Sequence, residues 1–482
     1  MRKYQIWFWQ NIQSPHMGSL ASALADRGYK VTFVINQILS KDRLEQGWEK
    51  AKLGKANLKI ANNKREIIEL AKKAPKNSIH FSQGLRGNHL VAYAQKILKK
   101  RKLRHWAMLE KINDNGLKGK IRRILYRIIF LFWRKHLEGV LAIGHGTKEW
   151  IVERGMQKKY VISFAYFLKE PQINKVLKFS KNKIKNSKFR FIFVGQLIKR
   201  KNLDILIKAI ASLKNDKIEL WIVGDGTEKE SLNSTSNLLI PGQVYWFGSL
   251  QMSKISEIIN QVDCLVLPSH HDGWGAVVSE ALLIGIPVIC SDTCGSSVIV
   301  KASGFGGIFP SNNEKVLAKM LHKQYKNGKL SKNIKQKIAS WARCLGAKSG
   351  AEYLDQIIVS VQNDSPGAMG SIFIEFENIW NSHFSDIITN IRTYLPEGYV
   401  DPFMAPVTFS AVLPHIASAI EGIDVLAVNS SNKQKLQYPD SFPVTPLKVI
   451  AIGGNRLSRG FTVKGLTINY FIRPTNYSDT LL

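Results

Sequence analysis

Two carboxylates, Asp272 and Glu280, stand eight residues apart across a glycine-rich turn, and the residues around them are of types that bind ligands. The turn follows an apolar run, 262–267, that is typical of a buried strand, and a helical segment comes next. Gly273 and Gly275 let the backbone approach a ligand, and the first turn of a helix offers free N–H groups. Because N–H groups hold phosphate and carboxylates hold hydroxyls, the turn suits a nucleotide sugar.

A second strand-to-helix loop, nearer the N-terminus, carries a run of cations. Gly195 follows an expected strand at 189–194, and residues 199–201 are all basic. Such a run can neutralise a diphosphate, and a solvated basic loop in a very basic protein is the alternative. The tight turn 224–226, after the next expected strand, is structural in most proteins. The loop 195–201 and the turn 224–226 indicate a particular kind of site only when they are considered together, in chain order, with the segment 268–288.

The elements that must position these loops alternate between strand and helix along most of the chain. This alternation predicts an α/β protein, with parallel sheets covered by helices on both faces. A polar break at 168–188 divides the pattern into two Rossmann-like domains that face each other across a cleft, with ligands at the carboxyl ends of the strands. The expected strands are Tyr4–Trp9, Val31–Ile35, Ile79–Phe81, Leu103–Leu109, Val140–Ile143, Phe189–Val194, Ile218–Val223, Tyr245–Phe247, Val262–Leu267 and Val288–Cys290.

The chain has 482 residues and a net charge of +33, and the charge is unevenly distributed. Residues 361–482 carry 8 basic and 10 acidic side chains, so the whole surplus lies in residues 1–360. A basic body of this size attracts phosphate, whether in nucleic acid, anionic lipid or a phosphorylated substrate. The four cysteines lack metal-ligand spacing and the N-terminus lacks a signal-peptide pattern, and both features favour a reduced, cytoplasmic location.

Joined in this order, the motifs from Gly195 to Val288 resemble those of the retaining glycosyltransferases of family 4, which have the GT-B fold of two facing Rossmann-like domains. The resemblance covers residues 1–360. It implies transfer of a sugar, with retention, from a nucleotide-sugar donor (a UDP- or GDP-sugar). No cofactor and no metal are implied, and the sequence has no Asp-x-Asp metal clamp.

The resemblance also assigns roles to individual residues. Glu280 matches the second acid of the family's E-x7-E motif and would hold the ribose hydroxyls, while Asp272 replaces the first Glu and would contact the transferred sugar. Arg200 and Lys201 match the basic pair that stabilises the leaving diphosphate, and Gln196 stands where the family usually has an arginine. The remaining candidate donor-binding residues are Gly195, Gly224, Gly273, Trp274 and Gly275.

The candidates on the acceptor side come from the first domain. His16 ends the loop 11–16 between an expected strand and an expected helix, and it would act on the acceptor as a catalytic residue. Helix capping or packing is the alternative for this histidine. Glu110 ends the strand 106–109 and is a further candidate for a sugar contact.

The helical segment 117–137 bears on the nature of the acceptor. At 100° per residue one apolar stripe is expected to face the core, namely Ile121, Ile124, Leu125, Ile128, Leu131 and Phe132. Tyr126, Phe130 and Trp133 lie off that stripe beside arginines, which suits a membrane interface, and a neighbouring helix covering them is the alternative. Seven Lys/Arg side chains exclude a span. We expect a peripheral enzyme at the anionic inner face of the cell membrane, with a lipid-linked or cell-surface polysaccharide acceptor, as in bacterial capsule or lipopolysaccharide biosynthesis.

The C-terminal part is typical of a separate piece. Residues 363–371 are expected to be a linker, and 367–371 resemble a cloning scar. Residues 372–482 resemble a truncated part of the endonuclease-type Z-one domain of helicase-like ATPases. Because the chain contains no Gly-x4-Gly-Lys-Ser/Thr loop, we expect no ATPase or nuclease activity from this fragment.

The expected domains are an acceptor-side domain, a nucleotide-sugar-binding domain, a closing helix, the linker and the C-terminal fragment, at 1–168, 169–345, 346–362, 363–371 and 372–482. Two other classes of function stay open. The high charge and the helicase-like fragment favour a nucleic-acid-associated protein, although the fragment is slightly acidic and the basic part has no nucleic-acid-binding signature. Gln196 and Asp272, which depart from the family pattern, favour a non-catalytic relative that binds a nucleotide sugar.

Overall fold

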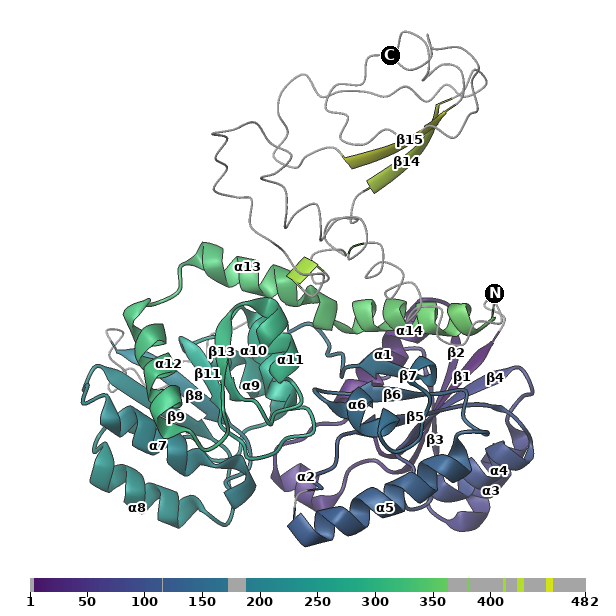
Figure 1. The fold of residues 1–482 in the computed structure, drawn as a ribbon, viewed down its shortest axis with the longest axis horizontal. Helices are drawn as coiled ribbons and strands as arrows, with labels where there is room; N and C mark the ends of the chain where they lie inside the picture. The colour runs from purple at the N-terminus through teal and green to yellow at the C-terminus, as the bar shows by residue number, and fades with distance from the viewer. Residues whose placement is uncertain are drawn as a thin grey trace. The chain divides into compact units, whose positions relative to one another are not determined.

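The structure is a computed structural model that describes residues 4–114, 116–171 and 188–362, and the short stretches 380, 411–412, 423–428 and 448–453. The chain divides into two compact units, Met1–Ile379 and Trp380–Leu482. The first unit contains two sheets with helices packed on both faces of each, coloured from purple to green in Figure 1. This arrangement confirms the predicted α/β class with two Rossmann-like domains.

The first sheet has seven parallel strands in the order β3-β2-β1-β4-β5-β6-β7. Its inner strand β1 is buried on both faces because alternate side chains of the run Ile6–Trp9 face opposite helix layers. The pattern missed the two edge strands, β3 and β7, which are four residues long and have no long apolar run. The strands are β1 (Gln5–Ile12), β2 (Lys30–Gln37), β3 (Asn57–Ile60), β4 (Ser78–Gln83), β5 (Arg104–Glu110), β6 (Gly139–Ile143) and β7 (Val161–Phe164).

Helices cover both faces of this sheet. The first of them, α1, begins at Pro15, which suits the first helical position because its missing N–H would have no helical partner there. The helices of the first domain are α1 (Pro15–Asp26), α2 (Lys41–Glu45), α3 (Lys64–Lys73), α4 (Val91–Lys100), α5 (Gly116–Trp133), α6 (Thr147–Val152) and the short η1 (Lys158–Tyr160).

The second sheet has six parallel strands in the order β10-β9-β8-β11-β12-β13. Its strands and helices bury one large apolar cluster centred on Phe191, Phe193 and Trp221. The edge strand β13 was not predicted, since it begins with two glycines. The strands are β8 (Phe189–Val194), β9 (Ile218–Val223), β10 (Val244–Trp246), β11 (Cys264–Leu267), β12 (Val288–Ser291) and β13 (Gly306–Phe309).

The helices of the second domain alternate with its strands, as Figure 1 shows. They are η2 (Lys199–Lys201), α7 (Leu203–Ser212), α8 (Lys229–Leu239), α9 (Met252–Ile259), α10 (Ala276–Ile284), α11 (Ser297–Ser303), α12 (Glu314–Lys326), α13 (Lys332–Ala342) and η3 (Arg343–Leu345). The next helix, α14 (Ala347–Gln362), returns to the first domain and packs against α1. Arg27 and Tyr29 both donate hydrogen bonds to Asp355 of α14.

The chain crosses between the two domains twice, and the two crossings pair with each other. Leu168 N donates to Leu345 O at 3.0 Å, and Ala347 N donates to Leu168 O at 2.8 Å. These bonds form a short parallel bridge between Leu168 and Gly346. The two crossings therefore lie side by side.

Helix α5 packs with the opposite face from the one expected. Tyr126, Phe130 and Trp133 are only 3%, 0% and 9% exposed, so the aromatic face is the core face. The rings of Tyr126 and Trp150 pack edge to face with centroids 5.0 Å apart, and Trp133 packs against His105. The predicted core stripe points to solvent instead, apart from the partly buried Leu125. The prediction was wrong because both faces are apolar, and the larger aromatic rings fill the space over the sheet.

The second unit is described only in part. Its strands β14 (Ile423–Val428) and β15 (Lys448–Gly453) pair in parallel. The linker 363–371 and most of the segment 372–482 lie outside the described residues. Across the part of the chain that the structure describes, no helix is long and apolar enough to cross a membrane.

Candidate functional site

A pocket of about 470 Å³ lies where the carboxyl ends of the strands of both sheets meet. The first domain contributes residues at the ends of β1, β4 and β5, and the second contributes residues at the ends of β8 and β9. This is where ligands bind in open parallel sheets. The pocket is lined by all of the site residues that the sequence suggested, which are His16, Gly195, Gln196, Arg200, Lys201, Gly224, Asp272, Gly273, Trp274, Gly275 and Glu280.

The cations of η2 are fixed against the loop that follows β11. Lys201 forms an ion pair with Asp272, and the two side chains are only 13% and 12% exposed. Arg200 Nη1 donates to the carbonyl of His271 at 2.8 Å, and His270 N donates to the carbonyl of Arg200 at 2.9 Å. The two loops thus hold a mostly buried ammonium group and a guanidinium group on one wall of the pocket.

The turns after β8 and β9 touch each other through backbone atoms alone. Gly224 adopts a φ of 135°, and a Cβ atom at this position would lie 1.9 Å from the carbonyl oxygen of Gly195. No other residue type fits there without moving one of the two turns. The glycines therefore bring the backbone of both turns to the pocket wall.

The N-terminus of α10 opens into the same pocket. Gly275 is the N-cap residue, its φ is 83°, and no side chain caps the helix. Gly275, Ala276 and Val277 all line the pocket. The N–H groups and the positive dipole end of the first helical turn are favourable partners for an anion.

Glu280 lies one turn further along α10 and is partly buried. Loss of solvent around its carboxyl group raises the pKa of Glu280 from 4.5 to about 7. Among the described residues, no hydrogen bond or ion pair reaches the side-chain carboxyl group of Glu280. A carboxyl group that lines a pocket without a protein partner is suited to accept hydrogen bonds from a ligand.

The first domain closes the pocket from the other side through Glu110. Tyr166 Oη donates to Glu110 Oε1 at 2.5 Å, and burial raises the pKa of both groups. Glu110 also touches the second domain, since a Cβ atom on Gly273 would lie 1.7 Å from Glu110 Oε2. Nearby, His145 N donates to the carbonyl of Gly295 at 2.8 Å. The two domains are therefore in direct contact at the pocket.

His16 is a buried, neutral member of the pocket wall. Burial, and then the nearby Arg43, lower the pKa of His16 to about 4. Its ring packs against Trp48 and Tyr166, with centroids 5.8 and 5.5 Å apart. His16 Nδ1 and Trp274 Nε1 are buried without a hydrogen-bond partner. Buried polar atoms are usually bonded, so these two are unusual, and both are shielded from solvent in this structure.

Several lining residues were not suggested by the sequence, and Arg43, Trp48 and Tyr166 are among them. The first two belong to α2 and the loop after it, and Arg43 stacks over the Trp48 ring at 4.3 Å. Tyr166 follows β7, which was itself not predicted. Such residues come from short elements with no periodic pattern, and only the three-dimensional fold brings them to the pocket.

No cluster of three or more His, Cys, Asp or Glu side chains that could hold a metal ion occurs within 4–114, 116–171 and 188–362 or the shorter described stretches. The expectation that no metal is needed therefore stays a prediction.

Comparison with protein families assigns two segments. Residues 174–341 match the model of the glycosyl transferases group 1, and residues 312–482 match the Z1 domain. The second match supports the resemblance noted for the C-terminal part. The assignment to family 4 in particular stays a prediction.

Curated relatives match over parts of the chain. A teichuronic acid biosynthesis glycosyltransferase, TuaC of Bacillus subtilis, is 33% identical over 106 residues, which are 22% of this chain and 25% of that protein. An uncharacterized glycosyltransferase of Methanocaldococcus jannaschii is 27% identical over 245 residues, with 48% and 60% covered. The capsular polysaccharide biosynthesis glycosyltransferase CapM of Staphylococcus aureus is 22% identical over 205 residues, with 40% and 54% covered. The chain thus spans between a quarter and three fifths of these relatives.

Solved structures match over both domains. HepE of Anabaena in complex with UDP has a TM-score of 0.60 and 14% identity, and the match covers 74% of this chain and 100% of that one. The lipopolysaccharide outer core galactosyltransferase WaaB in its apo form has a TM-score of 0.54 and 18% identity, with 74% and 99% covered. At these identities the likeness concerns the fold. The two sheets have the GT-B fold, and the match to the glycosyl transferases group 1 model lies mainly over the second of them.

Proposed function

We propose that this chain transfers a sugar, with retention, from a nucleotide-sugar donor to a lipid-linked or cell-surface polysaccharide acceptor, as a family 4 enzyme. One observation carries the proposal: a single pocket combines fixed cations, an uncapped helix N-terminus and an unpartnered carboxyl group. These are the groups that a diphosphate and a ribose need, in a pocket shared by both domains.

The donor would lie mainly against the second domain. Its diphosphate would contact Arg200, Lys201 and the first N–H groups of α10, while Glu280 would accept hydrogen bonds from the ribose hydroxyls. A UDP- or GDP-sugar would leave its sugar close to Asp272 and Gly273. The structural neighbours from Anabaena, which were solved with UDP and with UDP-glucose, support a donor of this class.

The chemistry follows from where charge develops. The bond between the anomeric carbon and the diphosphate oxygen breaks, a bond to the acceptor oxygen forms on the same face of the sugar, and the acceptor proton leaves with the phosphate. Negative charge grows on the leaving diphosphate, so fixed cations and helix N–H groups stabilise the transition state more than the ground state. The Lys201–Asp272 pair holds the ammonium group in place before the donor binds.

The acceptor would enter from the first domain. His16 is neutral, and its unpartnered Nδ1 would accept a hydrogen bond from a hydroxyl group once the surrounding side chains move to admit the acceptor. The relatives named for teichuronic acid and capsular polysaccharide biosynthesis support a glycan acceptor. An acceptor of this kind, attached to lipid, would bring the protein to the anionic inner face of the cell membrane.

The test is a binding and turnover panel on the full chain. Thermal-shift titration with UDP, GDP and ADP, followed by donor hydrolysis with the matching sugars, should single out one nucleotide. Glu280→Ala should abolish binding of that nucleotide, whereas Glu230→Ala, an exposed acid on α8 outside the pocket, should leave it unchanged. Equal binding by the parent and Glu280→Ala proteins would contradict the proposal.

The same panel distinguishes the proposed transferase from two other functions. A non-catalytic relative, favoured by Gln196 and Asp272, would bind the nucleotide sugar without releasing free sugar or extending a glycan. A nucleic-acid-associated function, favoured by the Z1 match over residues 312–482, would give salt-sensitive binding to DNA or RNA that Glu280→Ala does not change.

A further inference from the structure

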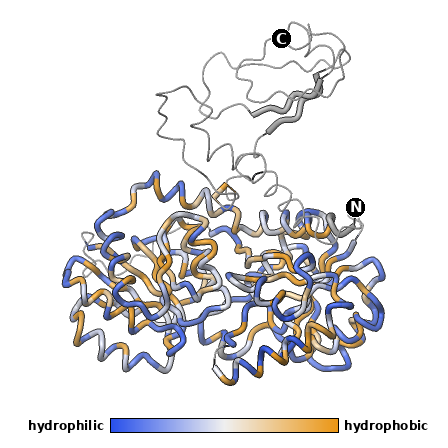
Figure 2. The backbone as a smooth tube through the Cα atoms, viewed as in Figure 1, coloured by the Kyte–Doolittle hydropathy of each residue, from blue (hydrophilic) through white to orange (hydrophobic). Residues whose placement is uncertain are grey.

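Helix α5 exposes an apolar face that no described element covers. Six of the thirteen large hydrophobic side chains exposed among the described residues belong to this one helix, with exposures from 44% to 79%. At 100° per residue, they occupy an arc of about 100° on the side opposite the buried aromatic rings. Figure 2 shows the orange stretches along α5, and the six residues are Leu117, Ile121, Ile124, Ile128, Leu131 and Phe132. Contiguous apolar surface of this kind marks an interaction site.

Cations border this face on both sides. Lys120 and Arg127 lie along one edge of the arc and Lys118 lies along the other, and all three are exposed. No acidic residue occurs from Gly116 to Leu137. On α5 itself the face therefore combines an apolar centre with basic flanking residues, and an apolar partner with negative charge at its surface would complement it.

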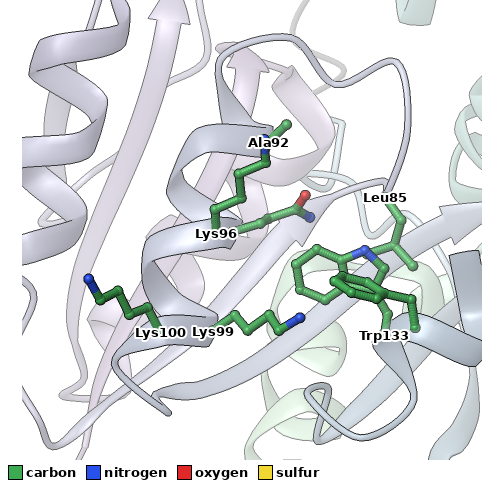
Figure 3. A pocket seen from close by; sticks show the side chains of 8 residues that line it. Leu85, Ala92, Lys96, Lys99, Lys100 and Trp133 are labelled. Atoms are coloured by element: carbon green, nitrogen blue, oxygen red, sulfur yellow. The ribbon is translucent and has the colours of Figure 1, made fainter.

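A second pocket continues this surface towards α4. Its volume is about 480 Å³, and Figure 3 shows its lining, with Lys99 extending towards Trp133. Lys99 Nζ lies 3.5 Å from the centroid of the Phe132 ring, so a cation and an exposed aromatic ring share one rim. Lys96 and Lys100 line the same pocket, and α4 has no acidic residue. The positive border thus extends from α5 across α4.

We propose that the exposed face of α5, together with the lysines of α4, is a docking surface for an anionic lipid bilayer. The apolar side chains would enter the boundary between head groups and acyl chains, and the bordering cations would contact lipid phosphates, each strengthening binding about fivefold. This docking role rests on the proposed function, because a lipid-linked acceptor is what gives membrane docking a purpose. Helix α5 begins six residues after Glu110, which lines the candidate active site, so docking would hold that site next to lipid-linked acceptors.

The experiment measures binding of the full chain to vesicles in the absence of nucleotide. We expect flotation with vesicles of phosphatidylcholine and phosphatidylglycerol at low salt, and little with phosphatidylcholine alone. The double variant Ile124→Asp/Ile128→Asp should lower binding at least about tenfold, because two charges would have to enter the acyl boundary. Lys96→Glu/Lys100→Glu should also lower it by about tenfold or more. The matched controls are Leu238→Asp, at an 80% exposed leucine of α8, and Lys323→Glu on α12.

Several results would overturn this proposal. Binding that is equal for neutral and anionic vesicles, or that the α5 variants lower no more than the controls do, would remove the lipid as partner. A dimer that Ile124→Asp/Ile128→Asp dissociates, with no vesicle binding by the parent, would assign the face to a second copy of the chain. Nucleotide binding, measured separately on every variant, reports on folding and on the candidate active site, so a failure of the proposed function would appear there and not in flotation.

Discussion

Replacing Glu280 by glutamine should have opposite effects on stability and on donor binding. Burial raises the pKa of this carboxyl group from 4.5 to about 7. Between these two pH values the folded protein holds a proton that the unfolded chain has lost, so stability falls as pH rises and is lowest above pH 7. A shift of this size corresponds to at most about 3 kcal/mol of unfolding free energy at pH 8. Glutamine keeps the shape and carries no charge, so Glu280→Gln should be more stable than the parent at pH 8 and equal to it at pH 4.

Donor binding should move in the other direction. Only the charged carboxylate is a full acceptor for two ribose hydroxyls, so affinity for the nucleotide should weaken by up to about tenfold per pH unit below pH 7. Glu280→Gln should bind weakly at every pH and lose this dependence. Urea unfolding at pH 4 and pH 8, together with calorimetric titration across the same range, measures both effects. A variant that is destabilised equally at both pH values, or that binds nucleotide as the parent does, would refute the assignment of Glu280.

Three further predictions concern the same pocket. Lys201→Ala should lower turnover by about 100- to 1000-fold, because it removes a fixed cation and leaves Asp272 without its partner. Steady-state kinetics would measure this loss beside the control Lys208→Ala, which changes a surface lysine of α7. A comparable loss of turnover in the control would count against a specific role for Lys201. Gly224→Ala should destabilise the protein by about 3 kcal/mol or more, because the new Cβ would meet the Gly195 carbonyl. The control is Gly242→Ala, where a Cβ atom meets nothing within 4 Å. Equal unfolding midpoints for the two variants would contradict the prediction. His16→Asn should slow transfer without moving the acidic limb of the pH–rate profile. The reason is that the pKa of His16 is about 4, so its ring is neutral above pH 5. A displaced acidic limb would show that the histidine titrates during catalysis.

The sequence predicted the central strands and the loops after them because these carry strong local signals. Long apolar runs gave β1, β8 and β9, and the glycines, cations and carboxylates that follow such runs gave the second-domain wall of the pocket. The edge strands β3, β7 and β13 were missed because each is only four residues long, and β13 also begins with two glycines. Tyr166 and Trp48 reach the pocket from irregular segments, and no periodicity predicts where such a segment passes.

Helix α5 shows a different limit. Its period correctly separates two faces, but both are apolar, and periodicity alone does not say which one packs on the sheet. The choice depends on volume: Tyr126, Phe130 and Trp133 fill the space beside Trp150, and six smaller or peripheral side chains are left outside. A sequence argument that weighs side-chain volume as well as hydrophobicity would have favoured the aromatic face.

The paired crossings at Leu168 and Gly346 determine how the two domains can move. Because the outgoing and returning segments are hydrogen-bonded to each other, they act as one two-stranded hinge, and α14 travels with the first domain through Asp355. A rotation of the domains about this bridge would keep its bonds intact, whereas sliding of the two segments past each other would break them. A rotation that separates Glu110 from Gly273 would widen the pocket that both residues line.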